Sequence, residues 1–234
     1  MIDLKVAGRV LVYILGTLLV LILSFSIFIF IGYLQYKIFV PDDYVLWIFN
    51  YPYSRFIIII VLYLFLLFFY FFFRKYWERE KTPITRKRRA LWIGFIVTNI
   101  LGFYIIFSSV TVITHQNIID HSFLYPQGKK YDFNDVVKID AGVRGDRFYL
   151  PFTHNKGDFY YKVEFIDGRK IDLNDEAGSY DSNGEHPTFV LNKLDARLVE
   201  MGITKVSSME NFHYTTEGLD RMYTDQIKSI LERK

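Results

Sequence analysis

A stretch of 27 residues without a charged side chain, Val10–Tyr36, constrains this chain more than any other feature. As an α-helix it would be about 40 Å long, which exceeds the roughly 30 Å hydrocarbon core of a bilayer. A cleaved signal peptide is the alternative. Its apolar part is only about 7–15 residues long and ends in a small-residue cleavage site, which this run lacks. The run therefore predicts an uncleaved membrane-spanning helix.

Two further uncharged runs lie within the first 114 residues. Phe56–Phe73 has 18 residues, which is near the lower limit for a span, and Ala90–Thr114 has 25. A buried helix of a soluble protein could explain one such run, but three in succession favour a membrane protein. We therefore expect an α-helical membrane region over residues 1–114, with three transmembrane helices at about residues 10–36, 56–73 and 90–114.

The charges between the spans predict their orientation. Residues 74–89 carry eight basic and two acidic side chains, whereas the charges of residues 37–55 balance. Basic residues in short loops stay cytoplasmic, so the 74–89 loop and the N-terminus are expected inside the cell, and the chain after the third span outside. The basic residues that end this loop could also bind anionic lipid headgroups, although a topology signal alone is favoured: Arg86, Lys87, Arg88 and Arg89.

The segment 37–55 between the first two spans is rich in aromatic residues, among them Trp47 and Tyr53. Amphipathic rings of this kind favour the boundary between membrane and water. Pro41 and Pro52 interrupt regular structure within the segment. We expect it to lie along the outer membrane interface.

Small residues recur at every fourth position of the third span, as Ala90, Gly94, Thr98 and Gly102. That spacing places them on one helix face, where two backbones can approach closely. Asn99 lies beside this face and could donate an interhelical hydrogen bond. The favoured interpretation is packing against the other two spans. The alternative is docking of another protein or of a second copy of the chain.

Residues 115–234 differ in kind from the region before them. They carry 16 basic and 20 acidic side chains, a net charge of −4, which argues against a nucleic-acid partner. Alternating apolar and polar residues replace the uncharged runs and predict strands. We expect a soluble, extracytoplasmic α+β domain with an antiparallel sheet and two helices towards its end. The strands are expected at residues 117–125, 130–133, 135–141, 159–166 and 169–173.

The strongest local pattern in this domain is a hairpin, in which Asp167 and Gly168 form a two-residue turn between alternating strands. An amphipathic helix is expected over residues 189–201, with Gly202 as its terminator. A second helix is expected over residues 216–232.

Part of the domain resembles a known family. The step Tyr131–Ile139 (YDFNDVVKI) and the hairpin with Asp167-Gly168-Arg169 are similar to those of bacterial PH-like domains, over about residues 117–200. These domains occur behind a few transmembrane helices in many bacterial membrane proteins. The resemblance implies a small closed or half-closed sheet capped by a helix, and a link in some members to immunity against peptide toxins. The long segment 142–156 departs from the family pattern.

Few residues indicate chemistry. The chain has no cysteine, and its five histidines lack the helical spacing of a metal site. Oxygen ligands gather in one polar segment and could bind calcium weakly outside the cell, although a solvated loop is favoured: Asp175, Asp181, Asn183 and Glu185. No nucleophile, phosphate-loop or dinucleotide motif occurs, so neither catalytic residues nor a cofactor are predicted.

These observations favour a non-enzymatic bacterial integral membrane protein whose outward-facing domain binds a protein or peptide, either as a subunit of a complex or as a homo-oligomer. A composition rich in Ile, Phe, Tyr and Lys without cysteine is typical of a low-GC Gram-positive organism. An immunity protein or envelope sensor is the first alternative. A membrane enzyme with an interfacial site is the second.

Overall fold

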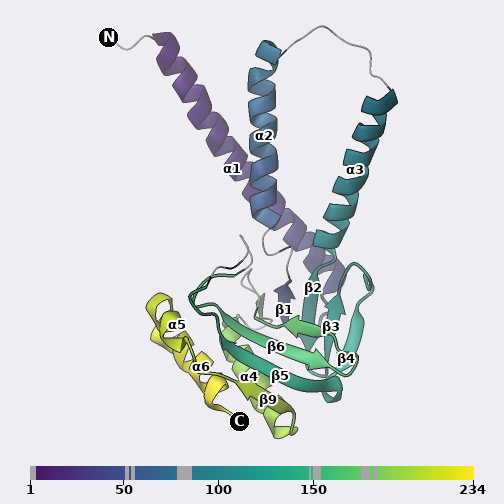
Figure 1. Cartoon of the computed structure of the whole chain (residues 1–234), viewed down its shortest axis with the longest axis vertical. Coiled ribbons are helices and arrows are strands. Elements are labelled where there is room, and N and C mark those ends of the chain that lie inside the picture. The colour runs from purple at the N-terminus through teal and green to yellow at the C-terminus, as the bar shows by residue number, and fades with distance from the viewer. Residues whose placement is uncertain are drawn as a thin grey trace.

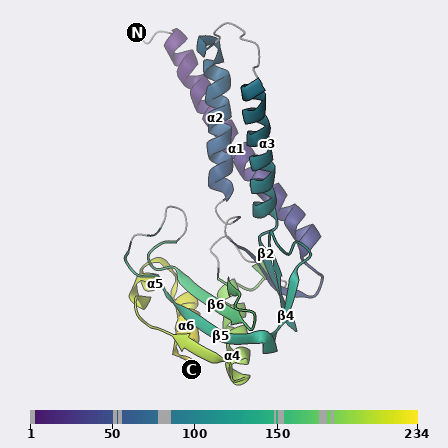
Figure 2. The ribbon, with the colours of Figure 1, turned by 45° about the vertical axis from the view of Figure 1, so that its right-hand side comes forward.

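The computed structural model describes residues 4–50, 53, 56–77, 86–147, 149, 154–174, 180–181 and 184–234. Three long helices, α1 (Leu4–Phe39), α2 (Phe56–Trp77) and α3 (Arg86–Phe107), extend from one side of an α+β domain. Figures 1 and 2 show the N-terminus at the far end of these helices and the C-terminus on the opposite side of the domain. The expected α+β architecture is therefore present.

Two of the long helices have the length and composition of membrane spans. They are Leu11–Phe39 within α1 and Arg89–Phe107 within α3. The apolar part of α2 whose side chains are described, Phe56–Tyr70, is shorter. Large apolar side chains are exposed along all three helices, such as Ile29 at 66% and Leu66 at 68%. Two of the three expected spans are thus candidates by length and composition.

The third helix ends earlier than its uncharged run. We expected a span to Thr114, but α3 ends at Phe107, and Val110–Thr114 forms strand β2. The hydroxyls of Ser108 and Ser109 donate to carbonyls in the preceding helical turn, at 2.9 and 2.7 Å. The sequence that follows, VTVIT, is β-branched at every position, which favours a strand.

The first sheet has the strand order β4-β3-β2-β1-β8. Its second-last strand, β1, lies in the segment expected along the membrane interface, so these residues form regular structure within a sheet of the domain. Because β1 and β2 both precede residue 115, the expected boundary between residues 114 and 115 cuts through this sheet. The strands are β1 (Tyr44–Phe49), β2 (Val110–Thr114), β3 (Asn117–His121), β4 (Lys129–Asp132) and β8 (Tyr180–Asp181).

Strand β1 is buried on both faces. Leu46 and Ile48 point into the core of the domain, whereas Trp47 and Phe49 belong to a second cluster with residues of the long helices, including Ile31. Gln35 of α1 is fully buried, and its Nε2 donates to the carbonyl of Phe107 at the end of α3, at 2.8 Å. The long helices and the domain therefore share a core.

The second sheet has the order β7-β6-β5-β9 and contains the predicted hairpin. Its turn has three residues instead of two, because the backbone N–H of Phe165 donates to the carbonyl of Arg169 at 2.9 Å. Gly168 adopts φ +79°, the left-handed conformation that such a turn needs. The strands are β5 (Val136–Val143), β6 (Phe159–Phe165), β7 (Lys170–Asp172) and β9 (Thr204–Ser207), with a 3₁₀ turn, η2 (Phe133–Asp135), before β5.

Three helices, one more than expected, accompany this sheet: α4 (Pro187–Glu200), α5 (Phe212–Gly218) and α6 (Arg221–Glu232). The first confirms the predicted helix and its terminator, since Gly202 has φ +78°. The expected final helix is divided, because Leu219 is extended and Asp220 begins a new helix as its N-cap. Strand β9 pairs in parallel with β5, so the sheet is not wholly antiparallel.

A buried ionic cluster connects the last helices to the second sheet. Asp195 of α4 is fully buried, and Lys205 of β9 and Arg233 each lie 2.6 Å from its carboxylate. Tyr161 of β6 donates its hydroxyl to the same carboxylate at 3.0 Å. Burial raises the pKa of Tyr161 and lowers that of Lys205. A buried carboxylate with this many partners fixes the relative position of α4, β6 and β9.

Candidate functional site

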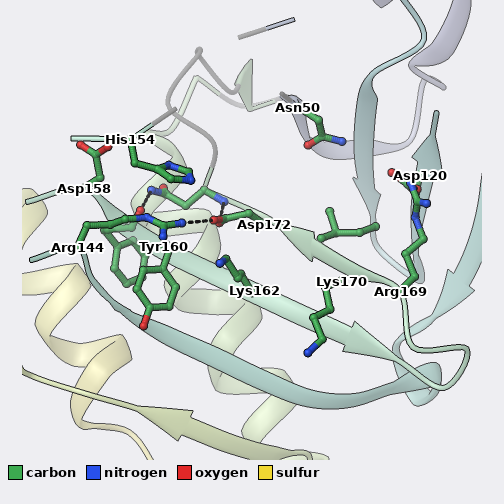
Figure 3. Close-up of a pocket in the computed structure, with 13 residues that line it drawn as sticks. Asn50, Asp120, Arg144, His154, Asp158, Tyr160, Lys162, Arg169, Lys170 and Asp172 are labelled. Carbon is green, nitrogen blue, oxygen red and sulfur yellow. Dashed lines mark hydrogen bonds and ion pairs between the residues drawn. The ribbon is translucent and has the colours of Figure 1, made fainter. Parts of the chain in front are cut away.

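A polar cavity of about 430 Å³ lies along β6 and β7, on the face of the second sheet that the core does not use (Figure 3). On β6 the residues Tyr160, Lys162 and Glu164 are half-buried, while their neighbours in sequence are buried in the core. Asn50, which follows β1, and Asp120 of β3 bring the first sheet to the same cavity. Four Lys or Arg and three Asp side chains line it.

One end of the cavity is formed by an anchored ion pair. Arg144 Nη2 lies 3.9 Å from Asp172 Oδ2, and both side chains are mostly buried. Asp172 Oδ1 accepts hydrogen bonds from the backbone N–H groups of Tyr161 and Asn174, each at 3.1 Å. The Arg144 guanidinium lies over the ring of Tyr160, 5.0 Å from its centroid. The carboxylate and the guanidinium are therefore held in place before any ligand arrives.

A glycine allows Tyr160 to take this position. Gly142 pairs with Tyr160 across β5 and β6, and a Cβ at Gly142 would lie 2.5 Å from the phenol oxygen. The ring therefore covers the neighbouring strand only because that position has no side chain. Burial raises the pKa of Tyr160, so its hydroxyl stays protonated at neutral pH and can donate a hydrogen bond.

The other end of the cavity contains a buried carboxylate. Asp120 is 1% exposed and forms an ion pair with Arg169. Its Oδ1 accepts a hydrogen bond from Thr111 at 3.2 Å, and Thr111 accepts one from Asn50 at 2.6 Å. Burial raises the pKa of Asp120, and the charge of Arg169 opposes that rise. Asp120 Oδ2 faces the Arg169 guanidinium, and Arg169 Nε has no hydrogen-bond partner among the described residues, so the arginine retains capacity for a further acceptor.

Two lysines lie between these ends (Figure 3). Lys170 pairs with Glu164 at 3.2 Å, whereas the described residues give Lys162 a contact with the Tyr160 ring and no ion pair. The cavity thus has two preformed Arg–Asp pairs, an ammonium at Lys162 and a further carboxylate, Asp158, at the Arg144 end. This arrangement suits a ligand with several hydrogen-bonding groups and an anionic group placed near Lys162.

The cavity also runs along β7, which is the last strand of the second sheet among the described residues. Backbone N–H groups of Phe165 and Leu173 donate to carbonyls across the hairpin, at 2.9 and 2.8 Å. By the alternation of an antiparallel ladder, the backbone groups of Lys170 and Asp172 point away from β6. An extended chain could pair with them.

Comparisons with known proteins add no relative, since no protein-family model, curated protein or solved structure matches the chain. The likeness of residues 117–200 to bacterial PH-like domains therefore stays a prediction. The function has to be inferred from the geometry of the site.

The calcium-binding prediction falls largely outside the described residues. Asp175 and Asn183 are not described, and Asp181 is described only as part of the backbone of β8. Glu185 forms an ion pair with Lys193 of α4 at 2.6 Å. No group of three metal-ligating side chains occurs among the residues that the structure describes.

The small residues of the third span lie apart from the other described helices. Ala90, Gly94 and Thr98 are exposed, and a Cβ at Gly94 or Gly102 would meet no described atom within 4 Å. Asn99, beside them, accepts a hydrogen bond from Tyr63 of α2 at 2.8 Å, and its Nδ2 donates within α3 to the Phe95 carbonyl at 2.7 Å. Contact between α2 and α3 thus uses Asn99, and the small-residue face itself is open.

The basic residues at the end of the 74–89 segment begin α3. Arg86, Lys87 and Arg89 are exposed, and the side chain of Arg88 lies outside the described part of the chain. Figure 1 places this end of α3 far from the domain. The roles of these residues as a topology signal and in binding anionic lipid headgroups stay predictions.

Sequence reasoning did not bring the residues of the polar cavity together as a site. Asp120 is the one with a signal, because it is a carboxylate within an otherwise apolar strand, Asn117–His121. Arg144 and Asp172 lie in segments without a recognisable motif. The long segment 142–156, noted as a departure from the family pattern, contains Arg144 and His154 of the cavity wall.

Proposed function

We propose that this protein is a bacterial integral membrane protein with three spans, whose α+β domain binds a protein or peptide partner outside the cytoplasm and has no catalytic role. The apolar exposed surfaces of α1 and α3 support insertion of these two helices. An apolar exposed α2 between them supports a third span, because its uncharged run continues to Phe73 in the sequence.

The distribution of basic residues supports the orientation. Residues 74–89 are expected in the cytoplasm with the N-terminus, which leaves the domain outside. Because the chain contains no cysteine, single cysteines can be introduced at the exposed positions Glu210, in the domain, and Lys87, in α3. An impermeant maleimide should label position 210 and not position 87 on intact cells. The opposite pattern would place the domain in the cytoplasm.

The observation that carries the binding proposal is the polar cavity beside the open edge of β7. An extended segment of a partner could pair with the backbone of Lys170 and Asp172 and place an acidic side chain near Lys162. Strand addition of this kind derives affinity from main-chain hydrogen bonds and specificity from adjacent pockets. The partner is therefore expected to present an extended, acidic segment.

Co-purification in mild detergent tests this proposal. Proteins recovered with the wild type are compared with those recovered with the charge-reversed Lys162→Glu/Lys170→Glu variant. Lys228→Glu on α6 is the matched control, since Lys228 is exposed and lies outside the cavity. The proposal expects a partner that is retained by the control and lost by the double variant. An identical set of proteins from all three would contradict it.

A further inference from the structure

An aromatic groove of about 350 Å³ lies where α1 meets β1, apart from the polar cavity. Seven of its nine lining residues are aromatic. Phe28, Tyr33 and Tyr36 come from α1, and Trp47 and Phe49 from β1. The groove is thus formed by the terminal third of the first long helix and by the strand that packs against it.

The floor of this groove is rigid. Tyr53 is fully buried, donates its hydroxyl to the carbonyl of Phe28 at 2.9 Å and stacks on the Phe28 ring. A Cβ at Gly32 would lie 3.2 Å from the Tyr53 hydroxyl and 3.3 Å from the Phe49 ring. The glycine therefore leaves open a space that a larger side chain on α1 would fill.

A lysine stands at one end of the groove. Lys37 Nζ lies 5.9 Å from the ring centroids of both Tyr33 and Tyr36, which line the groove. Tyr33 is 55% exposed, so this end is open to the surroundings of the helix. Among the described residues Lys37 has cation–π contacts and no carboxylate within ion-pair distance. An apolar aromatic channel thus ends at an uncompensated positive charge.

We propose that this groove binds a phospholipid, with an acyl chain against the aromatic rings and the phosphate at Lys37. The α1 wall of the groove lies within Leu11–Phe39, which is apolar and long enough to cross a bilayer, so lipid would surround this wall. Aromatic rings with a lysine near a helix end are suited to the depth of the headgroups. The proposal depends on membrane insertion of α1 and is independent of the partner-binding cavity.

Trp47 reports directly on the groove, because it lines it. A Trp77→Phe/Trp92→Phe variant of the full chain keeps Trp47 as its sole tryptophan. It is reconstituted in phosphatidylcholine vesicles that contain a minor fraction of phosphatidylglycerol brominated on its acyl chains, which quenches tryptophan on contact. A second variant keeps only Trp92, which is 61% exposed on α3 and measures quenching by bulk lipid.

The proposal expects Trp47 to be quenched more than Trp92 at the same fraction of brominated lipid. Lys37→Gln should lower the affinity of the groove for phosphatidylglycerol, read from the excess quenching of Trp47 over Trp92, about fivefold. This corresponds to the roughly 1 kcal/mol that one lysine contributes to anionic lipid binding. Lys37→Arg should retain it, and so should Lys138→Gln, which changes an exposed lysine of the domain.

Two results would overturn the proposal. Quenching of Trp47 that does not exceed that of Trp92 would show that the groove holds no lipid. If Trp47 is still quenched more than Trp92 to the same extent in Lys37→Gln, Lys37 does not bind the phosphate and the proposed binding mode is wrong. If Trp92 is not quenched at all, α3 is not in the bilayer, and the proposed membrane function fails together with the groove.

Discussion

The two sheets of the domain differ in which parts of the chain form them and in how their faces are buried. The second sheet and helices α4 to α6 come from the continuous segment after Val136, whereas the first sheet takes β1 from before α2 and β2 from after α3. The outer face of β6 is polar and lines a cavity, but β1 and the centre of β2 are buried on both faces. The second sheet is an ordinary half-solvated sheet, and the first connects it to the long helices.

Because of this difference, the structural boundary between the long helices and the domain does not fall at the end of α3. The ends of the helices pack together with the first sheet. Trp47 and Val112 of the first sheet share a cluster with Ile31 of α1 and Ile60 of α2. Leu46 and Ile113 share the other cluster with the second sheet. The domain is therefore not an independent body attached by a tether, since its first sheet is completed by strands that the membrane region supplies.

The largest effect is expected from separating these regions. A fragment of residues 115–234 keeps the second sheet but loses β1 and β2, the centre of the first. Each buried aliphatic residue lost, such as Leu46, Ile48 or Ile113, removes about 1.5–3 kcal/mol. The total stability of a domain is about 5–15 kcal/mol, so the fragment should not fold cooperatively. Circular dichroism during thermal unfolding measures this.

A matched fragment sharpens the test. Residues 40–50 joined to residues 108–234 by a flexible linker restore β1 and β2 without α2 and α3. This chain should regain more β structure than the 115–234 fragment, although Trp47 and Phe49 remain uncovered without α1. A cooperative transition in the 115–234 fragment alone would show that the second sheet is sufficient, contrary to the comparison.

The second effect in size concerns the contact between the two sheets. Phe165 of β6 is 1% exposed and stacks on Tyr131 of β4, with ring centroids 3.9 Å apart. Phe165→Ala should destabilise the full chain by about 3–5 kcal/mol, through lost transfer energy and a cavity. Thermal unfolding in detergent measures the shift. Val137→Ala, at a half-exposed position of β5, is the control and should change stability by less than about 0.5 kcal/mol.

The same comparison explains what could be predicted from the sequence. The hairpin of β6 and β7 was predictable because its alternation and its Asp-Gly turn are local signals. Strand β1 was not, because YVLWIF is buried on both faces and does not alternate. Strand β2 also has no charged residue. Because the third span was predicted from the length of an uncharged run, the predicted helix wrongly included this strand. Sequence patterns thus describe the second sheet well and the first poorly.

The polar cavity escaped prediction for a related reason. Asp120 and Arg169 form an ion pair although they are far apart in the chain, Asp120 on β3 of the first sheet and Arg169 just before β7 of the second. Likewise, Arg144 meets Asp172 only because β5, β6 and β7 are adjacent. No local motif contains both members of either pair, so only the tertiary structure brings them together.

A smaller effect is expected at the junction of the first sheet with α1. His121 of β3 is 5% exposed, lies against the Phe39 ring and has its Nδ1 3.0 Å from the Pro126 carbonyl. Burial lowers the pKa of His121 below its ordinary value of about 6.5, although the nearby charge of Asp120 opposes this. Below that pH the unfolded chain binds a proton that the folded chain does not, so stability should fall as the pH decreases.

Thermal unfolding across this pH range should therefore be less pH-dependent in His121→Gln than in the wild type. The raised pKa of Asp120 acts in the opposite direction at lower pH, because the folded state then binds its proton more tightly. Asp120 is present in both proteins, so their difference reports the histidine together with its coupling to Asp120. His213→Gln, at an exposed position of α5, is the control. Equal pH dependence in wild type and His121→Gln would refute the assignment.

The smallest effect is expected on α3, whose only buried residue in the second cluster, among the described residues, is Ile106 at its end. No described atom lies within 4 Å of a Cβ at Gly94 or Gly102, so Gly94→Leu/Gly102→Leu should leave the melting temperature in detergent unchanged. Gly16→Leu is the matched comparison, because a Cβ there would collide with the Phe68 ring of α2. It should lower the melting temperature clearly. A comparable loss in the double variant would mean that another helix packs on the small-residue face, and that α3 is held as firmly as α1.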